Sequence, residues 1–178
     1  MNDPVTLAER VRRTLRAIPD YPKPGIVFQD ITPVLGDGDL LRDVVAGMAG
    51  PFSRDRITHV LGIEARGFIL GGAVATHLGA GFVPARKPGK LPWQRVSQSY
   101  ELEYGTDAIE CHRDALPAGS RVLIVDDVLA TGGTAQAAGR LAAGLGARVA
   151  GWSFLLEIGG LGGRDRLGHV PPQIITSV

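Results

Sequence analysis

The segment that most constrains this chain runs from Arg121 to Thr134, RVLIVDDVLATGGT. Residues 121–125 are rich in β-branched side chains without polar alternation, which predicts a strand buried on both faces, as in a parallel sheet. Asp126 and Asp127 follow where that strand is expected to end. A loop of small residues and an Ala-rich helix come next, and the loop consists of Ala130, Thr131, Gly132, Gly133 and Thr134.

This order of elements predicts a site for a phosphorylated sugar. Free amides in the loop and the positive end of the helix dipole suit a phosphate. The two carboxylates can accept hydrogen bonds from sugar hydroxyls. An ordinary strand-to-helix turn is the alternative, with Gly and Thr as caps and solvated Asp side chains. A Walker-type loop lacks its Gly-Lys-Ser/Thr here, and no Gly-x-Gly-x-x-Gly follows the strand.

The segment resembles the signature of the type I phosphoribosyltransferases, whose co-substrate is 5-phosphoribosyl 1-diphosphate (PRPP). The resemblance implies that Asp126 and Asp127 bind the ribose hydroxyls. It also implies that residues 130–134 form the loop for the 5′-phosphate.

Composition favours one domain of ordinary globular type. The 178 residues suffice for one hydrophobic core and are few for two, so we expect a single domain over residues 1–178. A net charge of +1 gives no support to general polyanion binding. Cys111 is the one cysteine, which excludes an internal disulfide and fits a reducing compartment. Without a signal-like start or an apolar run of about 18 residues, the expectation is a cytoplasmic protein.

Strands and helices are expected to alternate from Thr58 onward, which predicts an α/β fold with a central, mostly parallel sheet flanked by helices. The expected strands are 58–63, 81–86, 121–125, 148–156 and 173–178, and the expected helices are 68–78, 133–145 and a short 162–167. Residues 98–104 and 108–112 alternate around Gly105, which predicts an inserted β-hairpin.

The part before Thr58 is expected to hold two helices and a connector. A first helix should start at Asp3-Pro4 and stop at Pro19, with Leu15 and Ile18 still on its apolar face. A second helix should cover 39–49, after a rigid 21–25 and a short apolar 26–31. The first helix carries four arginines, which fit a solvated face better than a nucleic-acid patch; they are Arg10, Arg12, Arg13 and Arg16.

A second strand-end turn, at 63–68, suggests a place for a diphosphate. Its amides at Glu64 and Ala65, with the Arg66 side chain, could bind one at a helix start, although a plain turn with a surface arginine is the alternative. In the type I family this position is the diphosphate loop, often with a cis peptide. Further along, a loop with Pro and Gly carries three cations, either solvated or directed at the phosphates as part of a lid; they are Arg86, Lys87 and Lys90.

With the segment 99–105, SYELEYG, the chain resembles the adenine phosphoribosyltransferases. The matching segments are 22–30, 33–35, 66–68, 86–92, 99–105 and 125–134. The resemblance implies a small hood built partly from the N-terminal segment. Adenine would be read by the main chain at Val27, stacked on Phe28 and closed on its other side by Glu157-Ile158. Glu103 would handle a purine proton, with Tyr104 in the same active-site flap.

Two positions depart from relatives in this pattern. Gln29 stands where some carry Arg, and Glu64-Ala65 replaces Asp-Ser, which leaves the details of base and diphosphate recognition open. The implied reaction is adenine plus PRPP giving AMP and diphosphate, with Mg²⁺ bound to the co-substrate and no metal-ligating residues in the chain. A homodimer is implied too, with 86–92 reaching toward the partner's site. The alternatives are a PRPP-sensing regulator that binds nucleic acid and an enzyme for another base.

Overall fold

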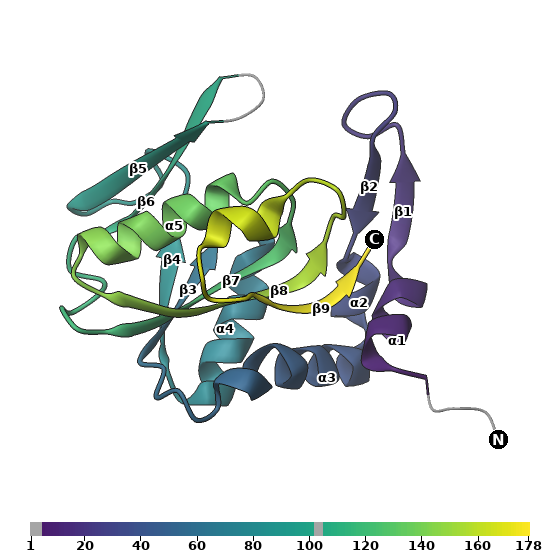
Figure 1. Ribbon diagram of the computed structural model, residues 1–178, viewed down its shortest axis with the longest axis horizontal. Coiled ribbons are helices and arrows are strands. Elements are labelled where there is room, and N and C mark those ends of the chain that lie inside the picture. Colours follow the sequence, from purple (N-terminus) through teal and green to yellow (C-terminus); the bar gives the residue numbers. More distant parts are fainter. Residues whose placement is uncertain (1–4, 102–104) are drawn as a thin grey trace.

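The computed structural model describes residues 5–101 and 105–178. Its centre is a five-stranded sheet in the order β4-β3-β7-β8-β9 (Figure 1). The strands are β3 (His59–Ile63), β4 (Gly81–Ala85), β7 (Arg121–Leu129), β8 (Arg148–Glu157) and β9 (Gln173–Ser177). All neighbouring pairs in this sheet are parallel, so the predicted α/β architecture is confirmed.

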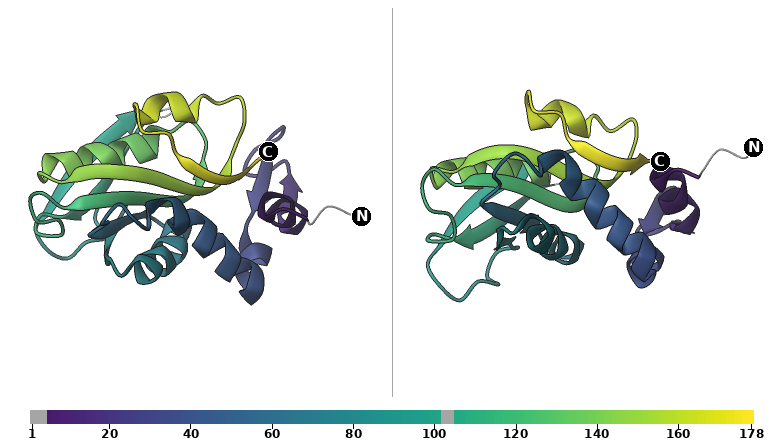
Figure 2. Two further views of the ribbon diagram at one scale, coloured as in Figure 1. Left: turned by 60° about the horizontal axis from the view of Figure 1, so that its bottom comes forward. Right: turned by 90° about the horizontal axis from the view of Figure 1, so that it is seen from below.

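Helices cover both faces of the sheet (Figure 2). One face carries α5 (Gly133–Gly144) and the 3₁₀ helix η2 (Gly163–Leu167), and the other carries α3 (Gly38–Ala49), the turn η1 (Gly50–Phe52) and α4 (Arg66–Leu78). Side chains of β7 alternate between two cores, because Val122 and Ile124 join the α5 side while Leu123 and Val125 join the α4 side. The apolar run therefore is a central strand buried on both faces, as predicted.

The central strand is longer than expected. The prediction that β7 ends at Val125 is wrong, because it pairs with β8 as far as Leu129, opposite Glu157. On its other side β3 stops, and the last β3 pairing is Gly62 with Val125. Asp126 and Asp127 thus lie within β7, on a stretch that projects beyond β3. This part of β7 is therefore not paired with β3, and the start of α4 lies beside it instead.

The predicted first helix is also wrong at both ends. Its predicted start, Asp3-Pro4, lies outside the described residues, and the N-cap of the observed helix is Thr6. Helix α1 covers Leu7–Thr14, and β1 (Arg16–Pro19) then pairs antiparallel with β2 (Val27–Asp30). Pro19 disfavours a helical Ile18, and the pairing satisfies the extended backbone. A short helix that the sequence did not reveal, α2 (Thr32–Gly36), follows. Its start is held by Asp30, which accepts bonds from the amide and hydroxyl of Thr32.

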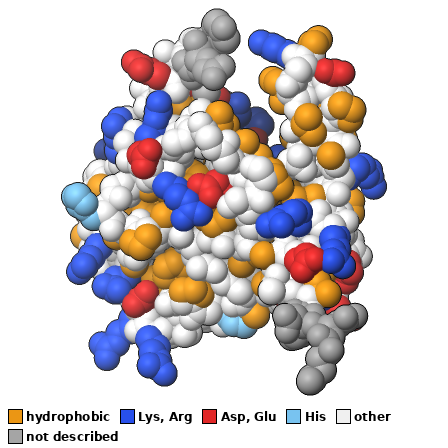
Figure 3. Space-filling view, turned by 45° about the vertical axis from the view of Figure 1, so that its right-hand side comes forward, with side chains coloured by type: hydrophobic (Ala, Val, Ile, Leu, Met, Phe, Trp, Pro, Cys, Tyr) orange, Lys and Arg blue, Asp and Glu red, His pale blue; other side chains and the backbone are white. Residues whose placement is uncertain are grey.

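The inserted hairpin is confirmed as β5 (Arg95–Glu101) and β6 (Thr106–His112), and β5 packs against α5. It rises at one side of the sheet, and the β1–β2 pair rises at the other (Figure 1). Figure 3 shows a notch between these two lobes, with Lys and Arg side chains along it. No helix in the described part of the chain is long and apolar enough to cross a membrane.

Candidate functional site

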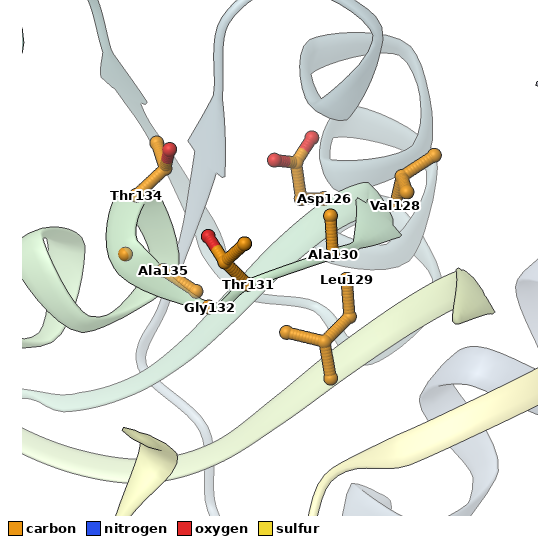
Figure 4. Close-up of a pocket in the computed structure, with 9 residues that line it drawn as sticks. Asp126, Val128, Leu129, Ala130, Thr131, Gly132, Thr134 and Ala135 are labelled. Atoms are coloured by element: carbon orange, nitrogen blue, oxygen red, sulfur yellow. The ribbon is translucent and has the colours of Figure 1, made fainter. Parts of the chain in front are cut away.

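The carboxylate of Asp126 faces a cavity of about 80 Å³ that the following loop encloses. Its lining consists of Asp126, Val128, Leu129 and residues 130–135. Figure 4 shows the Asp126 carboxylate and the hydroxyls of Thr131 and Thr134 on the same side of this loop. The first amides of α5 have no acceptor within the helix. The cavity therefore combines hydroxyl and amide donors with one carboxylate, as a sugar phosphate requires.

The loop reaches α5 through a glycine that has no substitute. Gly132 has φ +80°, in the left-handed region, and it is the N-cap residue of α5. A Cβ there would also lie 2.5 Å from the carbonyl oxygen of Gly163. Both the backbone angle and the close approach exclude a side chain. Gly132 thus fixes the path of the loop into the helix.

Asp126 is held in a place that disfavours its charge. The start of α4 closes in on it, since a Cβ on Gly67 would lie 2.7 Å from its Oδ1 atom. Oδ1 accepts the amide of Asp127 at 2.8 Å. Burial raises the pKa of Asp126 well above its usual value, and the negative charge of Asp127 adds to the effect. A ligand that donates hydrogen bonds or brings positive charge would relieve this cost.

Asp127 has a different role from its neighbour in this structure. It is only 6% exposed, and its Oδ2 lies 2.7 Å from Nε of Arg66. The Arg66 guanidinium also lies over the ring of Phe28, 5.1 Å from its centroid. Arg66 therefore joins the β1–β2 hood to the central strand. The sequence placed Arg66 at the diphosphate and Asp127 at the ribose, and the structure shows the two side chains paired with each other.

Glu64 gathers the cations that the sequence assigned to a diphosphate. Its Oε2 accepts from Nε of Arg86 at 3.2 Å and from the amide of Lys87 at 3.1 Å, and its Oε1 pairs with Lys90. Burial is the largest single effect and raises the pKa of Glu64, but bonds from Lys90, the Lys87 amide and Arg86 leave it below its ordinary value. The Glu64–Ala65 peptide, whose geometry the sequence left open, is cis.

The side chain of Lys87 turns the other way, toward the β5–β6 hairpin. Its Nζ lies 2.7 Å from Oδ2 of Asp107, which also accepts from the Tyr100 hydroxyl at 3.1 Å. The bond to Asp107 raises the pKa of Lys87. Burial raises the pKa of Tyr100. Asp107 was not predicted as a site residue, because nothing in the sequence of a hairpin turn indicates that its carboxylate pairs with a lysine 20 residues earlier.

The residues assigned to adenine lie on the hood and at the end of β8. Val27 is 52% exposed, and the Phe28 ring packs edge-on against Tyr21 at 5.3 Å. Ile158 is fixed by its amide, which donates to the carbonyl of Leu129 at 2.9 Å. Gln29 pairs with Ala17 in the β1–β2 register. Glu103 and Tyr104 lie outside the described residues.

Within residues 5–101 and 105–178, no three His, Cys, Asp or Glu side chains gather as a metal site would require. The accessible donors, Asp126 and the loop hydroxyls, fit an ion that arrives with its own ligands better than one caged by protein.

A parallel sheet with an acidic pair on its central strand, followed by an amide-lined loop and a helix, is the architecture of a type I phosphoribosyltransferase. Residues 35–159 match the family model of the phosphoribosyl transferase domain. An adenine phosphoribosyltransferase of Myxococcus xanthus is 55% identical over 164 residues, which cover 92% of this chain and 89% of that protein. The chain belongs to the adenine phosphoribosyltransferase family.

Solved structures show the same fold. The crystal structure of adenine phosphoribosyltransferase from Rhodothermus marinus superposes with a TM-score of 0.92 at 54% identity, covering 97% of this chain and 98% of the other. The enzyme of Saccharomyces cerevisiae, crystallised with an iminoaltritol bisphosphate and adenine, gives a TM-score of 0.89 at 38% identity, covering 95% and 98%.

Proposed function

We propose that this protein is a purine salvage enzyme that transfers the 5-phosphoribosyl group of PRPP to N9 of adenine, giving AMP and diphosphate. The observation that carries the proposal is the Asp126 cavity, whose lining suits a sugar phosphate, in a chain more than half identical to adenine phosphoribosyltransferases over most of its length.

The ribose 5-phosphate part of PRPP would occupy the Asp126 cavity. Its phosphate would accept bonds from the amides of residues 131–134 and from the hydroxyls of Thr131 and Thr134. Asp126 would accept from a ribose hydroxyl. Asp127 would act on the same sugar, with Arg66 holding it in place. In this arrangement the anomeric carbon would face the notch.

At that carbon, adenine would displace the diphosphate with inversion, through a state with oxocarbenium character like that of glycoside hydrolysis. Arg66, Arg86, Lys87 and Lys90 would stabilise the charge that builds on the leaving group. Mg²⁺, when bound with PRPP, would neutralise part of the same charge. The chain itself contributes positioning and electrostatics rather than a covalent nucleophile.

The base would lie against the hood. Phe28, held edge-on by Tyr21, offers a ring for stacking, and the exposed Val27 offers main chain to read the purine edge. Ile158 would close the opposite side. In this proposal Glu103 accepts the proton that N9 loses, with Tyr104 beside it. Glu103→Gln should then lower kcat with little change in PRPP affinity, measured by steady-state kinetics, whereas an unchanged kcat would remove Glu103 from that role.

The test of the function is a panel of bases with PRPP and Mg²⁺, followed by diphosphate release. Adenine should give strong turnover, and hypoxanthine, xanthine, guanine and pyrimidines should give little. Equal or better turnover with hypoxanthine or guanine would refute the base and favour an enzyme for another purine. PRPP binding without consumption would favour the regulator instead.

One observation bears on the regulator. The N-terminal arginines contact the chain's own residues: Arg10 pairs with Asp43, Arg13 with Glu9 and Arg16 with Asp30, while Arg12 donates to Thr176. This use of the arginines favours an enzyme over a nucleic-acid-binding protein.

We also infer that residues 1–178 form one phosphoribosyltransferase domain, that the enzyme works in the cytoplasm, and that two copies form a homodimer. The exposed loop 86–92, with Lys87 and Lys90 about half exposed, supports a reach toward the partner's site. Sedimentation at several concentrations would measure the assembly. A monomer with full activity would contradict it.

A further inference from the structure

The 3₁₀ helix η2 lies against the outside of the 5′-phosphate loop and contacts its backbone. A Cβ on Gly163 would collide with the carbonyl oxygen of Ala130 and would lie 2.9 Å from Cγ of Leu129. A Cβ on Gly132 would in turn lie 2.5 Å from the carbonyl oxygen of Gly163 and 3.3 Å from Cβ of Arg166. The loop and η2 therefore pack backbone against backbone, and each glycine admits the other segment.

Three contacts anchor η2 to the rest of the fold. The side chain of Leu167 is buried in the core on the α5 side. Gln136 of α5 donates to the carbonyl of Arg166 at 3.0 Å. Arg164 binds both oxygens of Glu157, at the end of β8, with distances of 2.6 and 2.7 Å.

The Arg164–Glu157 pair has the geometry of a strong ion pair. Both bonds are short and the fork is bidentate, which adds directional restraint to the attraction. Arg164 lowers the pKa of Glu157, and a further bond at 2.9 Å from the Ser177 hydroxyl ties the carboxylate to β9. The pair thus links the first turn of η2 to two strands of the central sheet.

We propose that Gly163 and Arg164 are positioning residues for the 5′-phosphate loop, which η2 holds in shape from outside. The loop itself consists of Ala, Thr and Gly and has few side chains with which to hold its own path. Amides bind phosphate only when they converge on it, so a small displacement weakens every contact at once. This inference rests on the proposed function, since it assigns the phosphate of PRPP to that loop.

The backbone bonds that hold Ile158 and Gly159 do not depend on the side-chain pair between Arg164 and Glu157, and this difference gives the inference its test. Ile158 is held by its amide on Leu129, and Gly159 by its amide on the carbonyl of Val178 at 2.8 Å. Neither bond involves the side chain of Arg164 or Glu157, whereas Gly163 packs against Leu129. Loss of the Arg164–Glu157 pair should therefore weaken binding of the sugar phosphate and leave adenine recognition unchanged.

The experiment measures the Kd of ribose 5-phosphate by titration calorimetry and the KM for adenine by steady-state kinetics. Arg164→Gln should raise the Kd up to about fivefold, the ceiling for a half-exposed ion pair. Arg164→Lys, which keeps the charge and loses the fork, should recover part of the loss. Gly163→Ala should raise the Kd on the order of a hundredfold, because it displaces the loop. The KM for adenine should stay at the wild-type value in both Arg164 variants.

Two matched controls are available. Gly144→Ala makes the same change at the other end of α5, where no atom lies within 4 Å of the new Cβ. Arg42→Gln removes an exposed arginine that pairs with Asp39 on α3. Both should bind ribose 5-phosphate like the wild type.

If Arg164→Gln binds ribose 5-phosphate with the wild-type Kd, the inference is wrong. This variant remains a sufficient test if Gly163→Ala fails to fold. A parallel rise in the KM for adenine would also overturn it, since general loosening would explain both. A wild-type protein that binds ribose 5-phosphate without using adenine would contradict the proposed function and leave η2 with its role. If the wild-type protein does not bind ribose 5-phosphate, both the proposed function and the proposed role of η2 are wrong.

Discussion

The two ends of the proposed PRPP site are built in opposite ways. The proposed 5′-phosphate end is made mainly of backbone. It consists of a loop of small residues and the start of α5, with Gly163 of η2 packed closely against the loop. The diphosphate end is made of charged side chains. There the cations already have carboxylate partners, since Arg86 and Lys90 share Glu64 and Lys87 pairs with Asp107.

This difference explains how one part of PRPP can be bound tightly while another part is released. A backbone cradle is rigid and needs no rearrangement to receive a phosphate. Paired side chains must exchange a carboxylate for a phosphate, so their net gain on binding is smaller. In the proposed site, the part of PRPP that remains in the product would therefore be held more firmly than the part that leaves.

The largest effect should come from changing the rigid end. Gly132→Ala forces a side chain onto a residue with φ +80° whose Cβ would meet the carbonyl of Gly163. Steady-state kinetics should show kcat/KM for PRPP falling on the order of a hundredfold, with a lower Tm because the left-handed backbone becomes strained. Near-normal kinetics would mean that the loop is pliable, and the contrast between the two ends would disappear.

The next effect separates the two carboxylates of β7. Asp126→Asn and Asp127→Asn should each weaken PRPP binding by about tenfold, as loss of a charged acceptor does. Their stabilities should diverge. Because the pKa of Asp126 is raised by folding, the folded state binds more protons there than the unfolded one, and stability falls as pH rises through that window.

Asp126→Asn removes this penalty and should raise Tm by about 2–4 °C at neutral pH, for a gain of ~1 kcal/mol. Asp127→Asn leaves Arg66 without its partner and should lower Tm. Calorimetric scans check both directions. The KM of the wild type for PRPP should also rise as the pH falls through the raised pKa of Asp126, and it should not do so in Asp126→Asn. Equal Tm shifts would show that the two acids share one environment.

At the charged end, Glu64→Gln should improve binding of the leaving group. The substitution frees Arg86 and Lys90 from a competing carboxylate, so the inhibition constant of diphosphate should fall by about threefold to fivefold. Product-inhibition kinetics at two ionic strengths measure the effect, which salt should reduce. A higher inhibition constant would mean that Glu64 orients the cations rather than competing for them.

The smallest effect is expected where the pair is most exposed. Asp107→Asn leaves Lys87, which is about half exposed, without its carboxylate. The KM for PRPP should change by less than about twofold, because such pairs contribute little. A change of tenfold would place Asp107 and Tyr100 among the residues that shape the site.

Local sequence patterns predicted which helices and strands form better than they predicted the residues at which these elements begin and end. The strand at 121–125 could be recognised because its side chains enter two cores, but its extension to Leu129 depends on the pairing partner that β8 supplies. The predicted helix through Ile18 failed for the same reason. Pairing with β2, an event outside the segment, decided its conformation.

The sequence predicted the strands of the sheet, the acidic pair and the proposed phosphate loop, because residues adjacent in the chain carry each of these features. The long-range contacts became known only from the tertiary structure: Arg66 pairs with Asp127, Lys87 pairs with Asp107, and Gly163 packs against the loop at Gly132. These contacts join segments far apart along the chain, and their energies depend on distance and burial. Neither quantity exists until the chain has folded.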